Sequence, residues 1–494
     1  MAVDPNDRVR TAADSLAALT NARSIAVIGA SATRGKIGHT ALNALLSSTF
    51  DGDLVAINQR ADEVLGVPSY PSIEDVPHPV DYIILAVPPK FVPEVLAGAA
   101  RKGVRIAQIL TSGFDGHGPD GVTVEDLHRA IAGSSLRLMG PNCIGSYVPR
   151  VGIAFTPLTS DVPGNVGIAS QSGGLAYDML LTGEEEGMRY SHVLSIGNCV
   201  DLDIPDYIAH LRQDEATDAI GLYVESVGDG RRFFEELRET AKTKPVFVLK
   251  GGRTSRGAAS VESHTGRLAG DYALWQTVIR QAGCSLTEST EHLLACLKAV
   301  SAPRVIRGRR TARLAEDADA GIALIGNGGG ATVLACDAAE ERGLRLAAVS
   351  DTTKQRLEDL TAETGEIATE SPVDLPLPRL IWDEGRLLCD MIECLSADPK
   401  VNGLVIHLNL LPLASRPEPE TILTPVLSRL EKADLSGVED VYFVFRGDGS
   451  EKVDALRRIA RDTVLDAVGA PVFKSMEEAV VGVAEARRVR DRRT

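Results

Sequence analysis

The chain has 494 residues, and its 52 lysines and arginines against 68 aspartates and glutamates give a formal net charge of −16, which makes it a poor candidate for binding the phosphate backbone of nucleic acids. Apolar residues make up 44% and aromatic residues 4%, so the core must be built from aliphatic side chains, as in parallel-sheet α/β proteins. The longest strongly apolar run, residues 82–87, is too short to cross a membrane and the acidic N-terminus does not resemble a signal peptide, so a cytoplasmic protein of about three domains is expected.

The first part of the chain alternates short apolar runs with helical patterns. Helices are expected at residues 11–22 and 38–48. Strands are expected at residues 24–29, 53–58, 81–87, 104–110 and 136–139. Strands that alternate with helices of this length predict a parallel, doubly wound sheet, and ligands of such sheets bind at the carboxyl ends of the strands.

Two more units of the same kind follow, separated by an arginine-rich connector at residues 304–313. Their strands are expected at residues 165–169, 190–195, 219–224 and 245–250, and at residues 321–325, 344–347, 403–408 and 441–445. Both units open with a strand, a glycine-rich polar turn and an alanine-containing helix. This pattern fits either an internal duplication or a beginning that many αβ folds share. The expected fold class is α/β, with three doubly wound units.

The first candidate binding site is the turn after the first strand, Gly29–Gly38. Glycines after a strand let the backbone approach a phosphate, and the next helix presents free N–H groups to it. The glycine spacing is not the dinucleotide fingerprint G-x-G-x-x-G. The second strand ends in Asn58-Gln59-Arg60, and an arginine there suits a phosphorylated ribose, as in coenzyme A or NADP. A nucleotide-type ligand is favoured over a purely structural turn.

The second candidate site combines His264 and Glu225. His264 lies in a stretch rich in glycine, serine and threonine, residues 251–270, which follows a predicted strand and is typical of an active-site lid or arm. An accessible histidine can act as a base, a ligand or a phosphoryl carrier. Glu225 directly follows the strand 219–224, where a carboxylate can orient an imidazole. From position alone, a solvated loop histidine and a solvated turn acid are the favoured interpretations.

The third candidate is a pair of helix starts that present backbone N–H groups to an anion. Two such ends that converge on one histidine would stabilise a phosphorylated imidazole. The residues are Ser170, Gln171, Ser172 and Gly173 in the second unit, and Asn327, Gly328 and Gly329 in the third.

The seven cysteines are scattered along the chain without a CxxC pair. This spacing argues against a disulfide framework and against a zinc ribbon, and no metal site is predicted. Reduced, mostly buried thiols are expected.

Taken together, motifs spread along nearly the whole chain resemble the NDP-forming acyl-CoA synthetase superfamily, the relatives of succinyl-CoA synthetase that include ADP-forming acetate–CoA ligase. Together they are far more specific than any one of them alone. The motifs are Ile28-Gly-Ala-Ser31, Gly35-Lys-Ile-Gly38, Ala61-Asp-Glu-Val-Leu-Gly66-Val-Pro68, Met139-Gly-Pro-Asn142-Cys-Ile-Gly145, Ser170-Gln-Ser-Gly173, Ser195-Ile-Gly-Asn198, Tyr223-Val-Glu225, Ser263-His-Thr-Gly266, Asn327-Gly-Gly-Gly330 and Ser371-Pro-Val-Asp-Leu375.

The resemblance implies a role for each part of the chain. His264 matches the histidine that carries phosphate between an acyl phosphate site and a nucleotide site, and Glu225 matches the acid that orients it. The helix starts at Ser170 and Asn327 match the two that hold the phosphohistidine. The implied domains are a CoA-binding Rossmann-like domain at 1–150, a flavodoxin-like domain with the phosphohistidine loop at 151–305 and a second flavodoxin-like domain at 310–494.

The resemblance also implies the ligands and a partner. Coenzyme A would be bound by Gly29, Ser31, Gly35, Lys36, Ile37, Gly38, Asn58, Arg60, Val87, Pro88, Ser112, Gly113, Asn142 and Cys143. The family's complete enzyme also has an ATP-grasp domain that takes ATP or ADP with Mg. Because the three αβ units account for the whole sequence, a partner β subunit carrying that domain is expected, in an αβ or α2β2 assembly. Two departures stand out: relatives commonly have Asn-Pro-Lys at residues 58–60, and a small residue at Arg267.

The implied protein is an acid–thiol ligase, an α-type chain that works with its ATP-grasp partner. It would convert a small carboxylic acid, ATP and CoA to acyl-CoA, ADP and phosphate through phosphorylated His264. A non-catalytic CoA- or acyl-CoA-binding subunit that scaffolds or regulates a partner is the alternative, although a scaffold has no need of the His264–Glu225 pair. A third hypothesis, an NADP oxidoreductase, is supported by Arg60 and the first unit alone. The sequence names neither the acid nor the choice between ADP and GDP.

Overall fold

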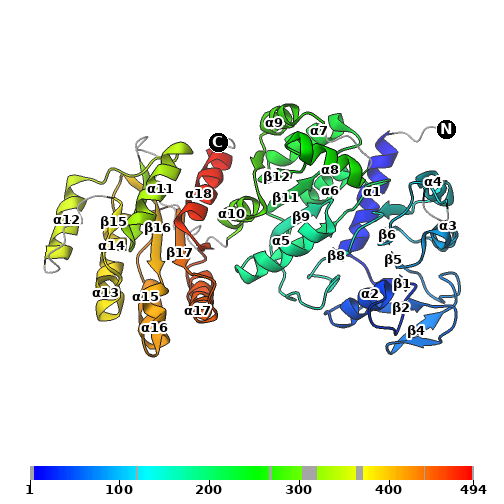
Figure 1. Ribbon diagram of the computed structural model, residues 1–494, viewed down its shortest axis with the longest axis horizontal. Helices are drawn as coiled ribbons and strands as arrows, with labels where there is room; N and C mark the ends of the chain where they lie inside the picture. Colours follow the sequence, from blue (N-terminus) through cyan, green and yellow to red (C-terminus); the bar gives the residue numbers. More distant parts are fainter. Residues whose placement is uncertain are drawn as a thin grey trace. The chain divides into compact units, whose positions relative to one another are not determined.

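The computed structural model describes residues 5–117, 121–265, 270–302, 320–362, 371–438 and 440–491, with the side chains of 5–11, 263–265 and 490–491 excepted. The chain divides into two compact units. The first comprises residues 1–185 and 189–293, and the second comprises residues 186–188 and 294–494. Three mostly parallel sheets confirm the α/β class, two of them in the first unit and one in the second (Figure 1).

The first sheet has seven strands in the order β3-β4-β2-β1-β5-β6-β7. From β1 the chain adds β2 on one side of the sheet and later β5 on the other side. At such a switch point between two parallel strands, a crevice opens at their carboxyl ends. The strands are β1 (Ser24–Ile28), β2 (Asp53–Ile57), β3 (Glu63–Val64), β4 (Val67–Tyr70), β5 (Tyr82–Leu85), β6 (Ile106–Ile109) and β7 (Arg137–Met139).

Alternate side chains of the first sheet pack against helices on its two faces. Ile25 and Val27 of β1 face the layer of α1 (Pro5–Thr20) and α2 (Ile37–Leu46). Ala26 and Ile28 face the layer of α3 (Val92–Lys102), preceded by the short η1 (Pro89–Phe91), and α4 (Val124–Ile131). All five residues of β1 are buried, because helices cover both faces of a parallel sheet.

The second sheet has the order β13-β12-β11-β9-β10-β8, and the switch point lies between β9 and β11. Only β8 runs antiparallel to its neighbour. The strands are β8 (Ser146–Tyr147), β9 (Val166–Ser170), β10 (Tyr190–Ser195), β11 (Ala219–Val224), β12 (Val246–Lys250) and β13 (Ser285–Thr287). The helices are α5 (Gly173–Glu185), α6 (Ile204–Gln213), α7 (Gly230–Ala241), α8 (Ser255–Thr265) and α9 (Tyr272–Gln281).

The third sheet has the order β15-β14-β16-β17-β18, which is the order of β10-β9-β11-β12-β13 in the second sheet without β8. This order confirms two flavodoxin-like sheets. Its strands are β14 (Gly321–Gly326), β15 (Val373–Asp374), β16 (Val401–Asn409), β17 (Asp440–Arg446) and β18 (Val472–Phe473). The helices are α10 (Thr290–Ser301), α11 (Gly329–Glu341), α12 (Asp351–Thr361), α13 (Leu377–Leu380), η5 (Trp382–Gly385), α14 (Arg386–Ser396), α15 (Leu411–Ala414), α16 (Pro419–Leu430), α17 (Glu451–Ala467) and α18 (Met476–Asp491).

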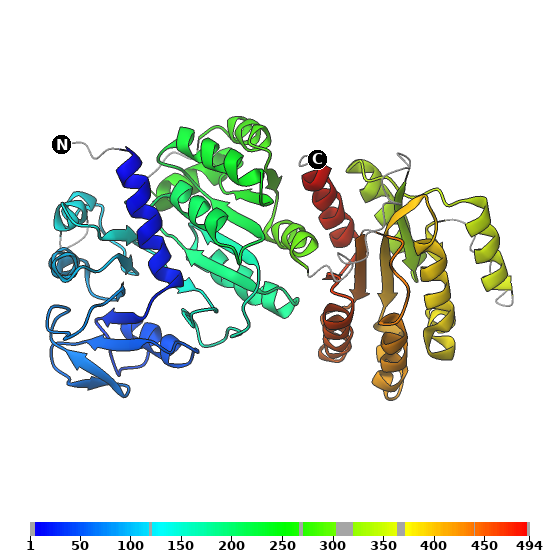
Figure 2. The same ribbon diagram turned by 180° about the vertical axis from the view of Figure 1, so that it is seen from behind.

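Helices cover both faces of the third sheet as well. One apolar cluster joins one face to α11 and α18, which lie side by side (Figures 1 and 2). The other cluster joins the opposite face to α12, α14, α16 and α17. Within the described residues, no helix combines the length and apolar character that crossing a bilayer requires.

Two expected elements differ in the structure. Residues 344–347 do not form a strand, and only an isolated bridge joins Leu346 to Ile322. Residues 344–347 and β15 lie along the same side of β14, and β15 pairs with the carboxyl half of that strand. The stretch 251–270 contains a helix, α8, which places His264 in a last helical turn. The hydroxyl of Thr254 accepts a hydrogen bond from the Gly257 N–H at 3.2 Å and so stabilises the start of α8.

The remaining expectations concern the connector and the thiols. The arginine connector at 304–313 lies outside the described residues. Six of the seven cysteines are buried, and no disulfide joins them in the described part of the chain.

Candidate functional site

A cavity of about 830 Å³, the first cavity, opens at the crevice between β1 and β5. It lies where the chain order reverses, which is where ligands of doubly wound sheets bind. Most of the residues predicted to bind the cofactor line it, namely Gly29, Ser31, Lys36, Ile37, Gly38, Asn58, Arg60, Val87 and Pro88.

Close packing between the β1 turn and α2 explains the glycines of the first cavity. Gly29 has a φ of +80°, and a Cβ at Gly38 would lie 2.0 Å from the Gly29 carbonyl oxygen. The Asn58 side-chain amide donates to the Ala30 carbonyl at 2.8 Å and accepts from the Arg60 N–H at 2.9 Å. These contacts fix the backbone of Arg60, whose side chain is exposed and is among those that line the cavity.

A second cavity, of about 710 Å³, lies at the start of α5. Gly35, Asn142 and Cys143, which were predicted with the cofactor set, line this cavity and not the first. Ile37 lines both cavities. The remaining lining includes Gln171, Ser172 and Gly173 and the apolar side chains of Leu110, Ile144, Phe155 and Tyr177.

Cys143 lines the second cavity as a protonated thiol. Its Sγ donates to the Ile109 carbonyl at 3.2 Å, and burial raises the pKa of the thiol to about 12. It is therefore a wall of the cavity and a poor nucleophile.

Two predicted cofactor residues, Ser112 and Gly113, are exposed after β6 and belong to neither lining. Their neighbour Thr111 lines the first cavity instead, and its hydroxyl donates to the Val87 carbonyl at 2.7 Å. Phe91 was also missed by the sequence argument, although it follows Pro88-Pro89 directly. Its ring lies in the first cavity with the Lys90 ammonium 5.2 Å from the ring centroid.

The two serines at the start of α5 act differently. The Ser170 hydroxyl is fully buried, donates to the Ser172 carbonyl at 2.7 Å and so shapes the turn. The Ser172 hydroxyl accepts from the Leu175 N–H at 3.3 Å, as a helix cap does. A Cβ at Gly173 would lie 2.7 Å from a methyl of Ile144, so glycine keeps this end of the helix open to the cavity.

Gln171 joins the ends of two strands. Its Oε1 accepts from the N–H groups of Glu225 at 2.6 Å and Ser226 at 3.1 Å, and its Nε2 donates to the Ser226 carbonyl at 3.0 Å. The side chain is predicted to bind phosphate, but these three bonds occupy it. It positions Glu225 at the switch point between β9 and β11.

Glu225 is 5% exposed, and its Oε1 accepts from the Tyr223 hydroxyl at 3.2 Å. Burial, followed by the charge of Glu225, raises the pKa of that tyrosine. The side chains of Ser263, His264 and Thr265, like residues 266–269 with Arg267, lie outside the described residues. The pairing of Glu225 with His264 therefore stays a prediction.

The start of α11 in the second unit already holds a carboxylate. The Gly328 N–H donates to Asp374 Oδ1 at 2.8 Å, and a Cβ at Gly329 would lie 2.9 Å from Asp374 Oδ2. Asn327 Oδ1 accepts from the Asn409 N–H at 2.8 Å. Asp374 was quoted in a motif, but its position at this helix start was not foreseen.

His407 of β16 lies beside the same turn. Its Cε1 is 3.6 Å from the position of a Cβ at Gly328. Neither ring nitrogen has a hydrogen-bond partner among the described residues, and burial lowers the pKa of the ring to about 4. The ring is therefore neutral at physiological pH.

Two family models match the chain. A CoA binding domain matches residues 23–149, and a succinyl-CoA ligase like flavodoxin domain matches residues 163–300. The first cavity lies in the range of the former, and α5, Glu225 and His264 lie in the range of the latter.

Solved and curated proteins resemble the chain over most of its length. Acetate–CoA ligase [ADP-forming] II subunit alpha of Pyrococcus furiosus is 34% identical over 386 residues, 78% of this chain and 80% of the relative. Acetate–CoA ligase [ADP-forming] I of Archaeoglobus fulgidus is 34% identical over 93% of this chain, which spans 62% of that relative. A dinucleotide forming acetyl-coenzyme A synthetase 1 of Ca. Korarchaeum cryptofilum, solved with phosphate and ADP, superposes with a TM-score of 0.79 at 26% identity, covering 97% of both chains.

The matches to the curated relatives and to the solved structure extend over both units. The chain belongs to the ADP-forming acetate–CoA ligase family of acid–thiol ligases, as a chain of the alpha-subunit type.

Proposed function

We propose that the chain is the α-type subunit of an acyl-CoA ligase that forms acyl-CoA from a carboxylic acid, CoA and ATP by way of phosphorylated His264. The observation that carries the proposal is that Ile37 lines both cavities. A CoA molecule with its nucleotide in the first cavity would pass Ile37 and bring its thiol to the start of α5. The relative from Pyrococcus furiosus is named as a subunit alpha, and this name supports a second chain in the enzyme. That partner would carry the ATP-grasp domain and would phosphorylate the histidine.

The proposed chemistry divides into two transfers. A carboxylate oxygen of the acid attacks the phosphorus of phosphorylated His264, the P–N bond breaks and an acyl phosphate forms. The CoA thiol loses its proton and attacks the acyl carbon, the C–O bond breaks and inorganic phosphate leaves. The N–H groups at Gly173 and Gly174 would stabilise the phosphoryl charge in both steps, because they begin a helix next to the second cavity.

The acid would lie in the second cavity with its carboxylate toward α5. Apolar side chains that include Phe155 and Tyr177 also line this cavity, and the centroids of these two rings are 6.2 Å apart. The cavity of about 710 Å³ also has to admit the CoA thiol and the phosphoryl group.

The reverse half-reaction tests the proposal without a partner chain. Acyl-CoA, inorganic phosphate and His264 should give free acid, CoA and phosphohistidine, since every group in that exchange belongs to this chain or its substrates. The purified chain is incubated with radiolabelled phosphate in three parallel reactions, which contain acetyl-CoA, isobutyryl-CoA or phenylacetyl-CoA. Acid-labile label that is absent from His264→Asn is expected with at least one of them, and the preferred acyl group identifies the acid.

Label that persists in His264→Asn, or that resists acid, contradicts the mechanism. A wild-type chain that binds CoA but takes no label from any acyl-CoA supports the non-catalytic scaffold instead.

A further inference from the structure

Lys250, the last residue of β12, carries a buried ammonium group at the carboxyl edge of the second sheet. The residue is 2% exposed. Its Nζ donates to the Glu225 carbonyl oxygen at 2.9 Å and to the Gly251 carbonyl oxygen. Its third side faces the ring of Trp275, with Nζ 4.9 Å from the centroid. These groups surround the cation with carbonyl dipoles and a π face.

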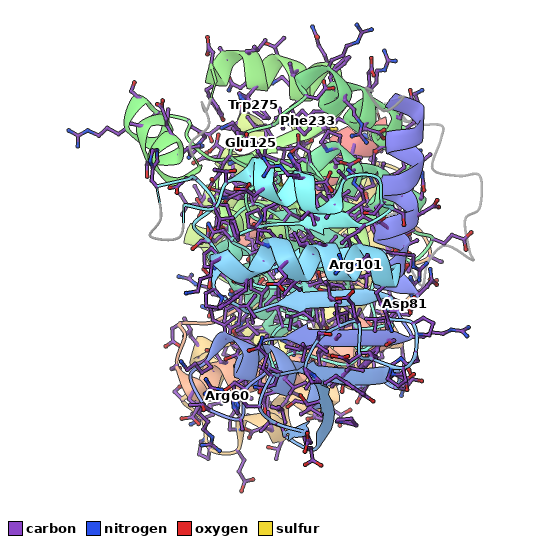
Figure 3. All side chains as sticks on the ribbon, turned by 90° about the vertical axis from the view of Figure 1, so that its right-hand side faces the viewer. Arg60, Asp81, Arg101, Glu125, Phe233 and Trp275 are labelled. Carbon is purple, nitrogen blue, oxygen red and sulfur yellow. The ribbon has the colours of Figure 1, made fainter. Side chains whose placement is uncertain are left out.

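The three partners of Lys250 belong to separate parts of the predicted phosphohistidine site. Glu225 is the predicted orienting acid. Gly251 begins the stretch 251–270, which includes α8 and His264. Trp275 lies near the start of α9, directly beyond the end of that stretch, and its ring packs against Phe233 with centroids 5.5 Å apart (Figure 3). One ammonium group thus contacts the backbone of the predicted orienting acid, the first residue of the segment that carries the histidine, and a ring in the helix that follows that segment.

The packing around Gly251 ties the same groups together more closely. A Cβ at this position would lie 2.6 Å from the Tyr223 hydroxyl and 3.4 Å from Cγ of Glu225. That hydroxyl is the one that donates to the Glu225 carboxylate. A shift of the Gly251 backbone would therefore displace the carboxylate through Tyr223, and Lys250 holds the Gly251 carbonyl in place.

A lysine is an expensive choice for a purely structural position. A buried ammonium group loses its hydration, and burial here lowers the pKa of Lys250 to about 8 against the opposing charge of Glu225. A methionine would fill a similar space without the loss of hydration. Lysine is rarely buried in protein cores unless it is paired. The cation is kept where its hydrogen bonds reach Glu225 and Gly251.

We infer that Lys250 is a positioning residue for phosphoryl transfer: it fixes the backbone of Glu225 and of Gly251, where the segment 251–270 begins, and holds both against the ring of Trp275 in α9. The inference rests on the proposed function, because it gives Lys250 a role only if His264 is phosphorylated.

The test compares Lys250→Met with Lys244→Met in the labelling half-reaction. Lys244 is a matched control, because its Nζ also donates to two carbonyl oxygens, those of Leu211 at 2.8 Å and Asp214 at 2.6 Å, but it precedes β12 at the opposite edge of the sheet. We expect Lys250→Met to slow labelling by about 100-fold, as small displacements of reacting groups do. The acyl-CoA concentration at half-saturation should not change, and Lys244→Met should label at the wild-type rate.

Thermal unfolding separates positioning from folding. Lys250→Met should unfold near the wild-type temperature, because removal of the desolvated charge offsets the hydrogen bonds that the two carbonyl groups lose. Wild-type labelling by Lys250→Met, or an equal loss in Lys244→Met, would overturn the inference. If Lys250→Met does not fold, Trp275→Leu decides: it should slow labelling by about tenfold through the lost cation–π contact, and an unchanged rate would overturn the inference. Absence of label in the wild type contradicts the proposed function instead.

Discussion

The carboxyl edges of the second and third sheets are built on one plan. Apart from β8, both sheets have the same strand order. In both, an amide side chain directly after one central strand (β9 or β14) accepts an N–H at the carboxyl end of the neighbouring central strand (β11 or β16). Gln171 accepts from Glu225 at 2.6 Å, and Asn327 accepts from Asn409 at 2.8 Å. In each sheet this hydrogen bond joins the two strands at the switch point, and the next helix, α5 or α11, begins within two residues of the amide.

The two edges differ in what lies at the start of that helix. At the second sheet, a hydroxyl caps α5 and a cavity of about 710 Å³ adjoins it. At the third sheet, the carboxylate of Asp374 accepts from the Gly328 N–H. A helix N-terminus attracts anions, so the second edge is open to an anionic ligand, while the third already has a negative charge of its own. A shared topology thus fixes where a site can form, and single side chains decide what it accepts.

The largest expected effect comes from removing the amide at each switch point. Gln171→Leu leaves the N–H groups of Glu225 and Ser226 without an acceptor, whereas Asn327→Leu leaves only that of Asn409. A buried unsatisfied N–H costs about 1–3 kcal/mol. Gln171→Leu should therefore lower the free energy of unfolding by about 2–6 kcal/mol, about twice the loss for Asn327→Leu. Urea unfolding followed by circular dichroism measures both.

The same two variants test whether the hydrogen bonds of Gln171 also affect phosphorylation of His264. Because Gln171 positions Glu225, Gln171→Leu should also slow labelling of His264 by about 100-fold at a urea concentration where it remains folded. Equal stability losses in the two variants, or unchanged labelling, would show that the amide at the second edge does no more than the amide at the third.

The two edges also show how far sequence reasoning reaches. Apolar runs that end on glycine, proline or asparagine located the three sheets, because parallel strands buried on both faces have that pattern. They also located the strand ends, and with them nine of the residues that line the first cavity. The stretch 251–270 was expected to be a loop, since its many glycines and serines mask the Thr254 cap and the helix that follows it.

The direction of a polar side chain was beyond that reasoning. Gln171 was predicted to bind phosphate because of its neighbours, yet it turns inward to the backbone after β11. Lys250 ends an apolar run and would pass as a solvated strand end. Its burial depends on Trp275, which packs on it from a different element. Asp374 reaches the α11 start from the neighbouring strand in the same way.

A further prediction concerns His407 of β16, which lies beside the α11 start at the third edge. Its pKa is lowered to about 4 by burial, while an unfolded histidine has a pKa of about 6.5. Between these values the unfolded chain binds a proton that the folded chain does not. This contribution to stability is therefore full above about pH 6.5 and is lost as the pH falls toward about 4. From pH 7 to pH 5 it amounts to about 2 kcal/mol.

Urea midpoints at pH 7 and pH 5 for the wild type and His407→Leu measure this effect. The variant should lose about 2 kcal/mol less than the wild type over that interval. It should still lose some stability, because burial lowers the pKa of His192 and His210 in the first unit as well. The exposed His117→Leu is the control and should behave as the wild type does. A pH dependence unchanged by His407→Leu contradicts the assignment.

The smallest expected effect comes from neutralising the carboxylate at the third edge. Asp374→Asn keeps an oxygen for the Gly328 N–H but removes the negative charge beside the start of α11. The free energy of unfolding should fall by about 0.5–1 kcal/mol, the usual contribution of an anion at a helix N-terminus. Inorganic phosphate, no longer repelled there, should bind about two- to fivefold more tightly by calorimetry. The comparison is made in a Gly173→Ala background, where the added methyl would lie 2.7 Å from a methyl of Ile144 and so crowd the α5 start. If phosphate binding does not change, the third edge has no role for an anion, and the carboxylate of Asp374 serves only to cap the helix.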